Sequence, residues 1–289
     1  MKILLTGASG FIGKNLKEYW ADRYDLFTPN RLELDLLRDE EVHEYLKKHT
    51  FDIVVHTANT NDFQYQLSSY DILSQNLRMF YNLEKNNWLY GRMYYFGSGA
   101  QYDARHYIPK MKETYFGQYL PTDAYGFSKY TMARIAEKSD NIYDLRLFGV
   151  FGKYEQWQRR FVSNALCRSI KEMPITISQN VKFDYLYIDD LCRIMDWFIL
   201  HIPICHCYNV CTGKAEELKQ IAETINEVTG LKRDIIINKP GYKLEYTGDH
   251  TRLMQELGDF QFTNKREAIK RMYQYYQSIQ GTIDKSQLV

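Results

Sequence analysis

The sequence lacks the features that define several classes of protein. Its 289 residues include five cysteines, an odd and low number, so we expect a reduced, cytoplasmic protein without a disulfide framework. Sixteen glycines and six prolines are too few for a collagenous or disordered chain. Its 37 basic and 36 acidic residues leave a net charge of +1, without the basic surplus of a nucleic-acid binder. We therefore expect no nucleic-acid partner.

Long hydrophobic runs are also missing. The most apolar stretch, residues 195–204, contains Asp196 and His201 and is too short to span a bilayer. The first seven residues hold a short apolar run before Gly7, which is less than a signal peptide requires. We expect neither a membrane span nor a signal peptide. The chain is 45% hydrophobic, which is enough for one large or two modest folded domains.

Strand-like and helix-like segments alternate through the first half of the chain. This alternation predicts an α/β fold with a Rossmann-type, doubly wound parallel sheet that helices cover on both faces. The predicted strands are residues 2–6, 24–27, 51–56, 92–96 and 143–148. The predicted helices are residues 11–20, 40–48, 68–87 and 124–138.

The pattern changes after Phe151. Residues 161–171, 189–200, 216–229 and 265–280 are predicted helices, with strands at 175–177 and 207–210, and Gly230 is expected to end the third of these helices. We predict a dinucleotide-binding domain over residues 1–151, with 184–210 returning to it. Residues 152–183 and 211–289 would form a smaller C-terminal α/β substrate lobe.

A glycine-rich segment, residues 6–13, lies between the first strand and the first helix. A tight turn at this point needs glycine, and unpaired N–H groups at a helix N-terminus attract a pyrophosphate. The alternative is a plain strand–turn–helix with incidental glycines, but the position and spacing favour a dinucleotide site. The predicted contacts are Thr6, Gly7, Ser9, Gly10, Phe11, Ile12 and Gly13.

The residues after the second strand bear on which dinucleotide binds. An acid there would accept hydrogen bonds from the ribose hydroxyls of NAD, whereas an arginine suits the 2′-phosphate of NADP. Asn30 and Arg31 come first, and no acid occurs before Glu33 and Asp35. We therefore predict NADP(H) with Arg31 on the phosphate. NAD(H), marked by Glu33 or Asp35, stays open as the alternative.

A serine, a tyrosine and a lysine form the second motif. Tyr125 and Lys129 are four residues apart on one helix, so they share a face, and the ammonium group is expected to lower the pKa of the phenol. Such a tyrosine can exchange a proton with a substrate oxygen. Ser98 follows the fourth strand, where the carboxyl ends of strands open a crevice. A Tyr–Lys pair alone is weak evidence for a catalytic site. Its combination with the glycine-rich turn and a serine after the fourth strand is far more specific.

With these motifs, the chain resembles the extended short-chain dehydrogenase/reductase family, which contains nucleotide-sugar epimerases, dehydratases and 4-keto reductases. The resemblance covers nearly the whole chain, including segments at 145–152, 184–191 and 208–210. It implies that Ser98, Tyr125 and Lys129 are catalytic. It also implies a nucleotide-sugar substrate and leaves a homodimer open. Further cofactor contacts implied by it are Asn30, Arg31, Asp35, Leu36, Thr57, Ala58, Asn76, Phe148 and Val150.

The chain departs from the family pattern in the part that would bind the nucleotide. Gly149 replaces an asparagine that contacts substrate, and Phe183 stands where an arginine would bind the diphosphate. We predict that Lys182, Arg159 or Arg160 supplies the missing charge. Ser98 and its neighbour Gly99 complete the predicted substrate contacts.

The residues after Ser98 narrow the reaction. Gly99 and Ala100 stand where the dehydratases carry an acid pair, so elimination of water lacks its acid and base. Ala100 also occupies the position of a cysteine used for epimerisation by GDP-fucose synthases. We predict an NADPH-dependent reductase of a nucleotide-linked 4-keto-6-deoxysugar. The alternatives are an NAD-dependent nucleotide-sugar 4-epimerase and a non-catalytic NADP-binding regulator.

A cluster of histidines and cysteines follows the helix at 189–200. Its members are His201, Cys205, His206, Cys207 and Cys211. The spacing matches no standard zinc module, and alternating cysteines in a strand behave as small apolar residues. We therefore expect no metal site.

Overall fold

The computed structural model describes residues 1–60 and 67–288. In these residues a six-stranded sheet has the order β10-β5-β4-β3-β1-β2, and every neighbouring pair is parallel. The order reverses between β1 and β3, which confirms the predicted doubly wound Rossmann-type sheet. Its strands are β1 (Lys2–Thr6), β2 (Asp25–Phe27), β3 (Phe51–His56), β4 (Tyr90–Ser98), β5 (Ile142–Leu147) and β10 (Cys207–Val210).

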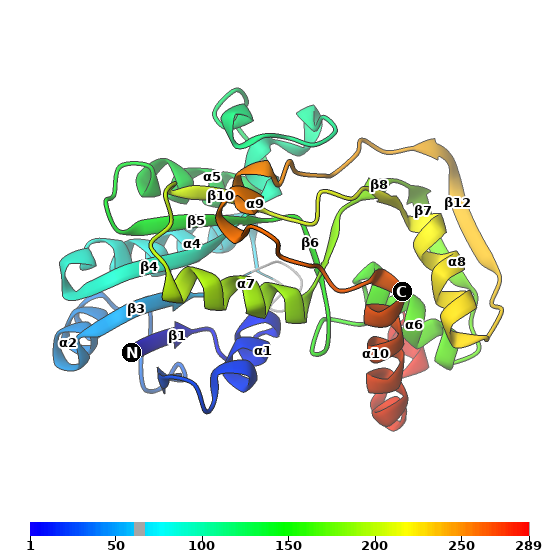
Figure 1. Ribbon diagram of the computed structural model, residues 1–289, viewed down its shortest axis with the longest axis horizontal. Helices are drawn as coiled ribbons and strands as arrows, with labels where there is room; N and C mark the ends of the chain where they lie inside the picture. The colour runs from blue at the N-terminus through cyan, green and yellow to red at the C-terminus, as the bar shows by residue number, and fades with distance from the viewer. Residues whose placement is uncertain (61–66, 289) are drawn as a thin grey trace.

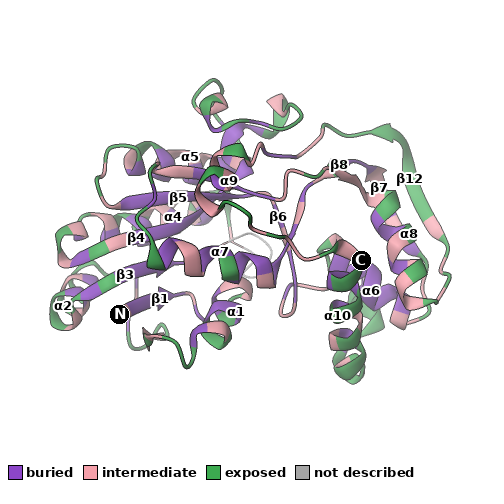
Figure 2. Cartoon of the chain, viewed as in Figure 1, coloured by how far each residue is buried: buried purple, intermediate pink, exposed green. Residues whose placement is uncertain are grey.

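Helices cover both faces of this sheet (Figure 1). Successive side chains of a strand point to opposite faces, so Ile3 and Leu5 enter one buried cluster and Leu4 enters the other. The strands at the centre of the sheet are buried along most of their length (Figure 2). On the Ile3 face lie α1 (Phe11–Trp20) and α7 (Ile188–Leu200), and on the Leu4 face lie α2 (Asp39–His49), α4 (Ser69–Glu84) and α5 (Ala124–Ala136).

Elements from the C-terminal half form a second layer beside the sheet (Figure 1). β7 (Ile175–Asn180) and β12 (Ile235–Tyr242) pair in parallel. The helices α6 (Phe161–Ile170), α8 (Leu218–Thr229) and α10 (Lys265–Ser278) pack on one another and on these strands. Gly230 has a φ of 71° and ends α8, as predicted. No helix in the described part of the chain has the length and apolar character to cross a bilayer.

Short elements that the sequence patterns did not predict join the two parts. β6 (Gly149–Phe151) pairs in parallel with β9 (Tyr185–Tyr187), and β8 (Lys182–Phe183) pairs antiparallel with β11 (Glu216–Glu217). The helix expected at residues 216–229 therefore starts two residues late, because Glu216 and Glu217 belong to β11. A further helix, α9 (Thr251–Leu257), packs on β10. The carboxyl ends of the sheet strands face this junction.

Candidate active site

The glycine-rich turn joins β1 to α1 in a conformation that needs its first and last glycines. Gly7 has a φ of +69°, and a Cβ atom on it would lie 2.5 Å from the backbone nitrogen of Ala58. A Cβ atom on Gly13 would lie 2.2 Å from the carbonyl oxygen of Gly7. Gly10 is the N-cap of α1 and gives it no side-chain cap. The first N–H groups of α1 are thus available to an anion, which fits the pyrophosphate of a dinucleotide.

A cavity of about 920 Å³ extends from this turn across the ends of the sheet strands. It is large enough to hold much of a dinucleotide. Of the predicted cofactor residues, it is lined by Ser9, Gly10, Phe11, Ile12, Gly13, Thr57, Ala58, Tyr125, Lys129, Phe148 and Val150. Outside this lining lie Thr6, Gly7, Asn30, Arg31, Asp35, Leu36 and Asn76.

The residues that follow β2 lie at the edge of the sheet. The Arg31 guanidinium is 3.7 Å from the Asp35 carboxylate, and the arginine side chain is 75% exposed. Asn30 accepts a hydrogen bond from the backbone of Leu32 (2.8 Å), and Leu36 is buried in the core under α4. Arg31 and Asp35, on which the choice between NADP and NAD depends, are therefore neighbours.

Two other predicted cofactor residues shape the loop after β3. The Thr57 hydroxyl donates to the carbonyl oxygen of Thr6 (2.7 Å). The buried Asn76 side chain accepts from the backbone nitrogen of Thr60 (2.8 Å) and donates to its carbonyl oxygen (2.9 Å). Asn76 thus fixes the loop that borders the cavity and does not line the cavity itself.

Ser98, Tyr125 and Lys129 all line this cavity. Ser98 ends β4, and α5 begins one residue before Tyr125, capped by Asp123, which accepts from the backbone of Gly126 (2.7 Å). Ser98 and Tyr125 line the same cavity, and the Ser98 side chain lowers the pKa of the Tyr125 phenol. The Lys129 ammonium lies 5.7 Å from the centre of the Tyr125 ring. The structure therefore brings together the three residues that the sequence patterns selected.

The electrostatics of the tyrosine differ from the prediction. Burial raises the pKa of Tyr125, and its hydrogen bond with Ser98 and the charge of Arg160 offset only part of this effect. Burial also lowers the pKa of Lys129 to about 8, against an opposing effect of Asp144. The expected lowering of the Tyr125 pKa by Lys129 is wrong for this structure, because desolvation dominates and the ammonium donates to the carbonyl oxygen of Phe96 (2.8 Å).

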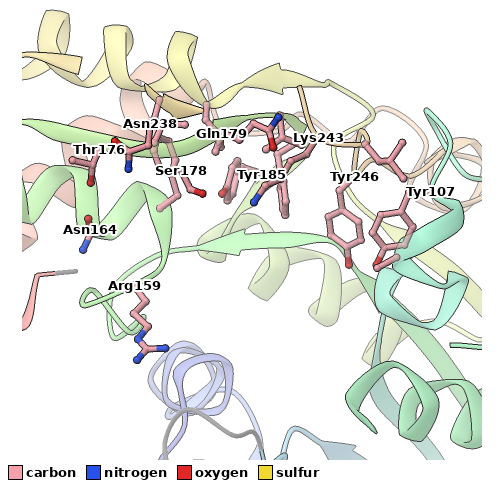
Figure 3. A pocket seen from close by; sticks show the side chains of 17 residues that line it. Tyr107, Arg159, Asn164, Thr176, Ser178, Gln179, Tyr185, Asn238, Lys243 and Tyr246 are labelled. Atoms are coloured by element: carbon pink, nitrogen blue, oxygen red, sulfur yellow. The ribbon is translucent and has the colours of Figure 1, made fainter. Parts of the chain in front are cut away.

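A second cavity of about 890 Å³ is lined mainly by residues of the C-terminal layer, together with Ala104 and Tyr107 (Figure 3). Arg159 lines this second cavity, whereas Arg160 lines the first. Lys182 is exposed on β8 and lies outside both linings, so the structure does not place this candidate for the missing charge at either cavity. The two cavities adjoin, and both are lined by Phe161, Phe183, Tyr185 and Tyr246.

Several residues at the second cavity carried no sequence signal. Tyr107, Gln179, Lys243 and Tyr246 lie in segments without a motif and reach the cavity through pairings between distant parts of the chain (Figure 3). The backbone bridge between Phe183 and Tyr246 is one such pairing. Single-sequence patterns do not reveal contacts of this range.

The histidines and cysteines for which we expected no metal lie in and around β10. Among the described residues, no three His, Cys, Asp or Glu side chains are grouped as metal ligands. The thiol of Cys207 instead contacts the Arg252 guanidinium at 3.0 Å, and Cys211 is buried.

Comparison with known proteins finds relatives that span nearly the whole chain. A GDP-6-deoxy-D-talose 4-dehydrogenase of Aggregatibacter actinomycetemcomitans is 26% identical, over 94% of this chain and 97% of that protein. A GDP-L-colitose synthase of Yersinia pseudotuberculosis is 22% identical, over 96% and 98%. A GDP-mannoheptose C4 reductase from Campylobacter jejuni, solved with NADP bound, superposes with a TM-score of 0.81 at 20% identity, covering 96% of this chain and 98% of that chain.

A glycine-rich turn that shares one cavity with a serine, a tyrosine and a lysine defines an NAD(P)-dependent oxidoreductase. Residues 3–211 match a family model, which assigns the chain to one family within this class. The chain belongs to the NAD-dependent epimerase/dehydratase family.

Proposed function

We propose that this protein is an NADPH-dependent reductase that converts the C4 ketone of a nucleotide-linked 4-keto-6-deoxysugar into an alcohol. The observation that carries the proposal is the grouping of Ser98, Tyr125 and Lys129 in the same cavity as the N-terminus of α1. A carbonyl group placed between the cofactor site and these side chains would have both a hydride source and a proton source.

The proposed mechanism assigns a separate task to each side chain. The nicotinamide supplies a hydride when the cofactor is bound. The Ser98 hydroxyl polarises the ketone by donating to its oxygen, and the Tyr125 phenol gives that oxygen its proton. Burial raises the pKa of Tyr125, so the phenol is protonated at neutral pH and has a proton to give. Lys129 would hold the ribose hydroxyls of the cofactor.

The second cavity supports a nucleotide-linked substrate. Aromatic rings of Phe183, Tyr185 and Tyr246 offer stacking surfaces for a base or a sugar, and Arg159 and Lys243 supply positive charge at the same cavity. The relatives named above act on GDP-linked sugars according to their names. GDP-linked ketosugars are therefore the first substrates to test.

The preference for NADPH is supported by Arg31 in the segment that follows the second strand, where a 2′-phosphate would be recognised. The Campylobacter reductase of the same fold was solved with NADP. Asp35 beside Arg31 is the residue that would favour NAD instead.

The proposal is tested by supplying 4-keto-6-deoxysugars linked to GDP, UDP or ADP and following NADPH consumption. We expect turnover of at least one of them. Tyr125→Phe should lower kcat by about 10²–10⁴-fold, the usual contribution of a general acid, with NADPH affinity unchanged. Tyr130→Phe, the same change farther along α5 and outside both cavity linings, is the control. Tightly retained NAD with interconversion of C4 epimers, or full activity of Tyr125→Phe, would refute the proposal.

A further inference from the structure

Tyr246 is held at the junction of the two cavities by its backbone. It follows β12, and its backbone nitrogen donates to the carbonyl oxygen of Lys182 (3.0 Å). Its own carbonyl oxygen accepts from the backbone nitrogen of Asp184 (3.3 Å). Tyr246 is therefore paired with Lys182, the first residue of β8, and with Asp184, the residue after β8, although Tyr246 itself lies outside any regular strand.

The ring of Tyr246 is held by three other aromatic rings. Its centre lies 4.8 Å from that of Tyr107, 4.8 Å from that of Phe183 and 5.1 Å from that of Phe148. Figure 3 shows Tyr107 and Tyr246 side by side at one end of the second cavity. Packing on several sides restricts the rotamer of the ring, so the direction of its hydroxyl group is set by the fold.

The hydroxyl of Tyr246 reaches the active site of the first cavity. A Cβ atom on Gly99 would lie 2.6 Å from this oxygen, which places it directly over the residue next to Ser98. The Ser98 side chain lowers the pKa of both phenols, Tyr125 and Tyr246. Tyr246 thus belongs to the same hydroxyl cluster as the proposed general acid.

The hydrogen-bonding capacity of Ser98 explains why a second phenol matters. A serine hydroxyl has one proton to donate and two lone pairs to accept with. The backbone nitrogen of Ala100 donates to Ser98 at 3.2 Å and occupies one lone pair. If Ser98 donates its single proton to the substrate, it can still accept from only one phenol. Ser98 therefore cannot hold both phenols, and we place both phenols as donors to the substrate's oxygen.

Burial raises the pKa of Tyr246, so this phenol keeps its proton at neutral pH. The charge of Arg160 and the hydrogen bonds with Ser98 and Tyr107 oppose this effect only in part. A phenol that stays protonated is a hydrogen-bond donor throughout the reaction and is not consumed by it. This is the property needed in a group that stabilises an oxyanion.

We propose that Tyr246 is a further catalytic residue, a second hydroxyl that donates a hydrogen bond to the substrate's carbonyl oxygen beside Ser98. In the step, a C–H bond forms at C4 from the hydride while the electron pair of the carbonyl moves to oxygen. That oxygen takes the proton of Tyr125, and the O–H bond of Tyr246 stays intact. Tyr125, left as phenolate, regains a proton from solvent. This inference rests on the proposed ketone reduction.

The position of Tyr246 also places it close to both the reacting carbonyl group and the proposed site of the nucleotide. It lines both cavities, and its backbone is paired with residues on either side of Phe183, which also lines both. A nucleotide seated in the second cavity would contact the same short segment that carries the hydroxyl donor. The catalytic contribution of Tyr246 should therefore appear in kcat for the nucleotide-linked ketone.

The test compares Tyr246→Phe with wild type on the ketosugar that wild type reduces fastest. The phenylalanine keeps the ring and its packing, so melting temperature and NADPH affinity should be unchanged. We expect kcat to fall by about 10²-fold, at the lower end of the loss caused by removing one oxyanion donor. The fall should be the same across the pH profile, because Tyr246 does not titrate in the working range. Tyr242→Phe, an exposed tyrosine bonded to Glu217, is the control and should match wild type.

The remaining outcomes of this test contradict either the role of Tyr246 or the proposed reduction itself. A Tyr246→Phe enzyme whose kcat is within about threefold of wild type would overturn the role of Tyr246 and leave the proposed reduction standing. A loss of activity that follows a lower melting temperature or weaker NADPH binding would make Tyr246 a packing residue and overturn the inference. A wild-type protein that reduces no ketosugar would overturn the proposed function first, and the role of Tyr246 with it.

Discussion

Substituting alanine at two glycines of the β1–α1 turn separates folding from cofactor binding. At Gly13 the added methyl would lie 2.2 Å from the Gly7 carbonyl oxygen and 2.8 Å from the Ala8 Cα. These are backbone atoms, so α1 must shift. Overpacking of this kind costs about 1–3 kcal/mol. For a protein of this size the melting temperature falls by about 2–4 °C for each kcal/mol.

At Gly10 the geometry differs. The nearest atom to the added methyl is the Gly7 carbonyl oxygen at 3.3 Å, a contact that a shift of a few tenths of an ångström relieves. The methyl instead enters the cavity above the N-terminus of α1, where a phosphate would accept hydrogen bonds from the backbone. Losing one such charge-assisted bond costs about 1.5–3 kcal/mol. Dinucleotide binding should weaken by about ten- to a hundredfold.

Two measurements on each variant distinguish a loss of stability from a loss of dinucleotide binding. Thermal unfolding without ligand should show Gly13→Ala clearly destabilised and Gly10→Ala within about 1 kcal/mol of wild type, the usual cost of replacing glycine by the poorer N-cap alanine. Fluorescence titration with NADPH should show weakened binding for Gly10→Ala. A Gly10→Ala protein that binds NADPH like wild type would refute the placement of the pyrophosphate at this helix terminus.

Three further predictions test single parts of the structure. Arg159→Ala should raise the KM for the nucleotide sugar by about tenfold or more through the loss of a charge-assisted hydrogen bond in the second cavity, whereas Lys182→Ala should not, and equal KM values for both variants would contradict this. Arg31→Ala should weaken NADPH binding more than NADH binding in paired titrations, and an unchanged NADPH affinity would make NAD the better assignment. Burial raises the pKa of Glu155 from 4.5 to about 8, so the native state keeps a proton that the unfolded state loses. The free energy of unfolding should fall as pH rises from about 4.5 to 8, and Glu155→Gln should remove that decline in denaturant titrations.

The dinucleotide-binding fold could be read from the sequence because its signals are local. Buried parallel strands appear as continuous apolar runs, and the glycine spacing at residues 6–13 is tied to one strand–turn–helix geometry. β8, β9 and β11 were missed because strands of two or three residues have no measurable period. β12 carries Pro240 and Gly241 and is mostly exposed, so it lacks the apolar pattern of a strand.

The proposed active site was predictable only where its residues belong to motifs. Ser98, Tyr125 and Lys129 are placed by β4 and α5, and the structure gathers them as expected. Tyr246 reaches the site through a backbone pairing with β8, which is distant in sequence. The raised pKa of Tyr125 depends on the depth of burial, which the spacing of Tyr125 and Lys129 does not reveal.

The most direct test of ketone reduction follows the hydride itself. NADPH carrying deuterium at the transferable position of the nicotinamide would be incubated with the protein and a nucleotide-linked 4-keto-6-deoxysugar, and the product examined by NMR and mass spectrometry. We predict one deuterium per product molecule, bound to C4 in a single configuration, with one NADPH oxidised for each alcohol formed. Deuterium absent from C4, or an epimerised sugar formed with no net oxidation of NADPH, would contradict the assignment.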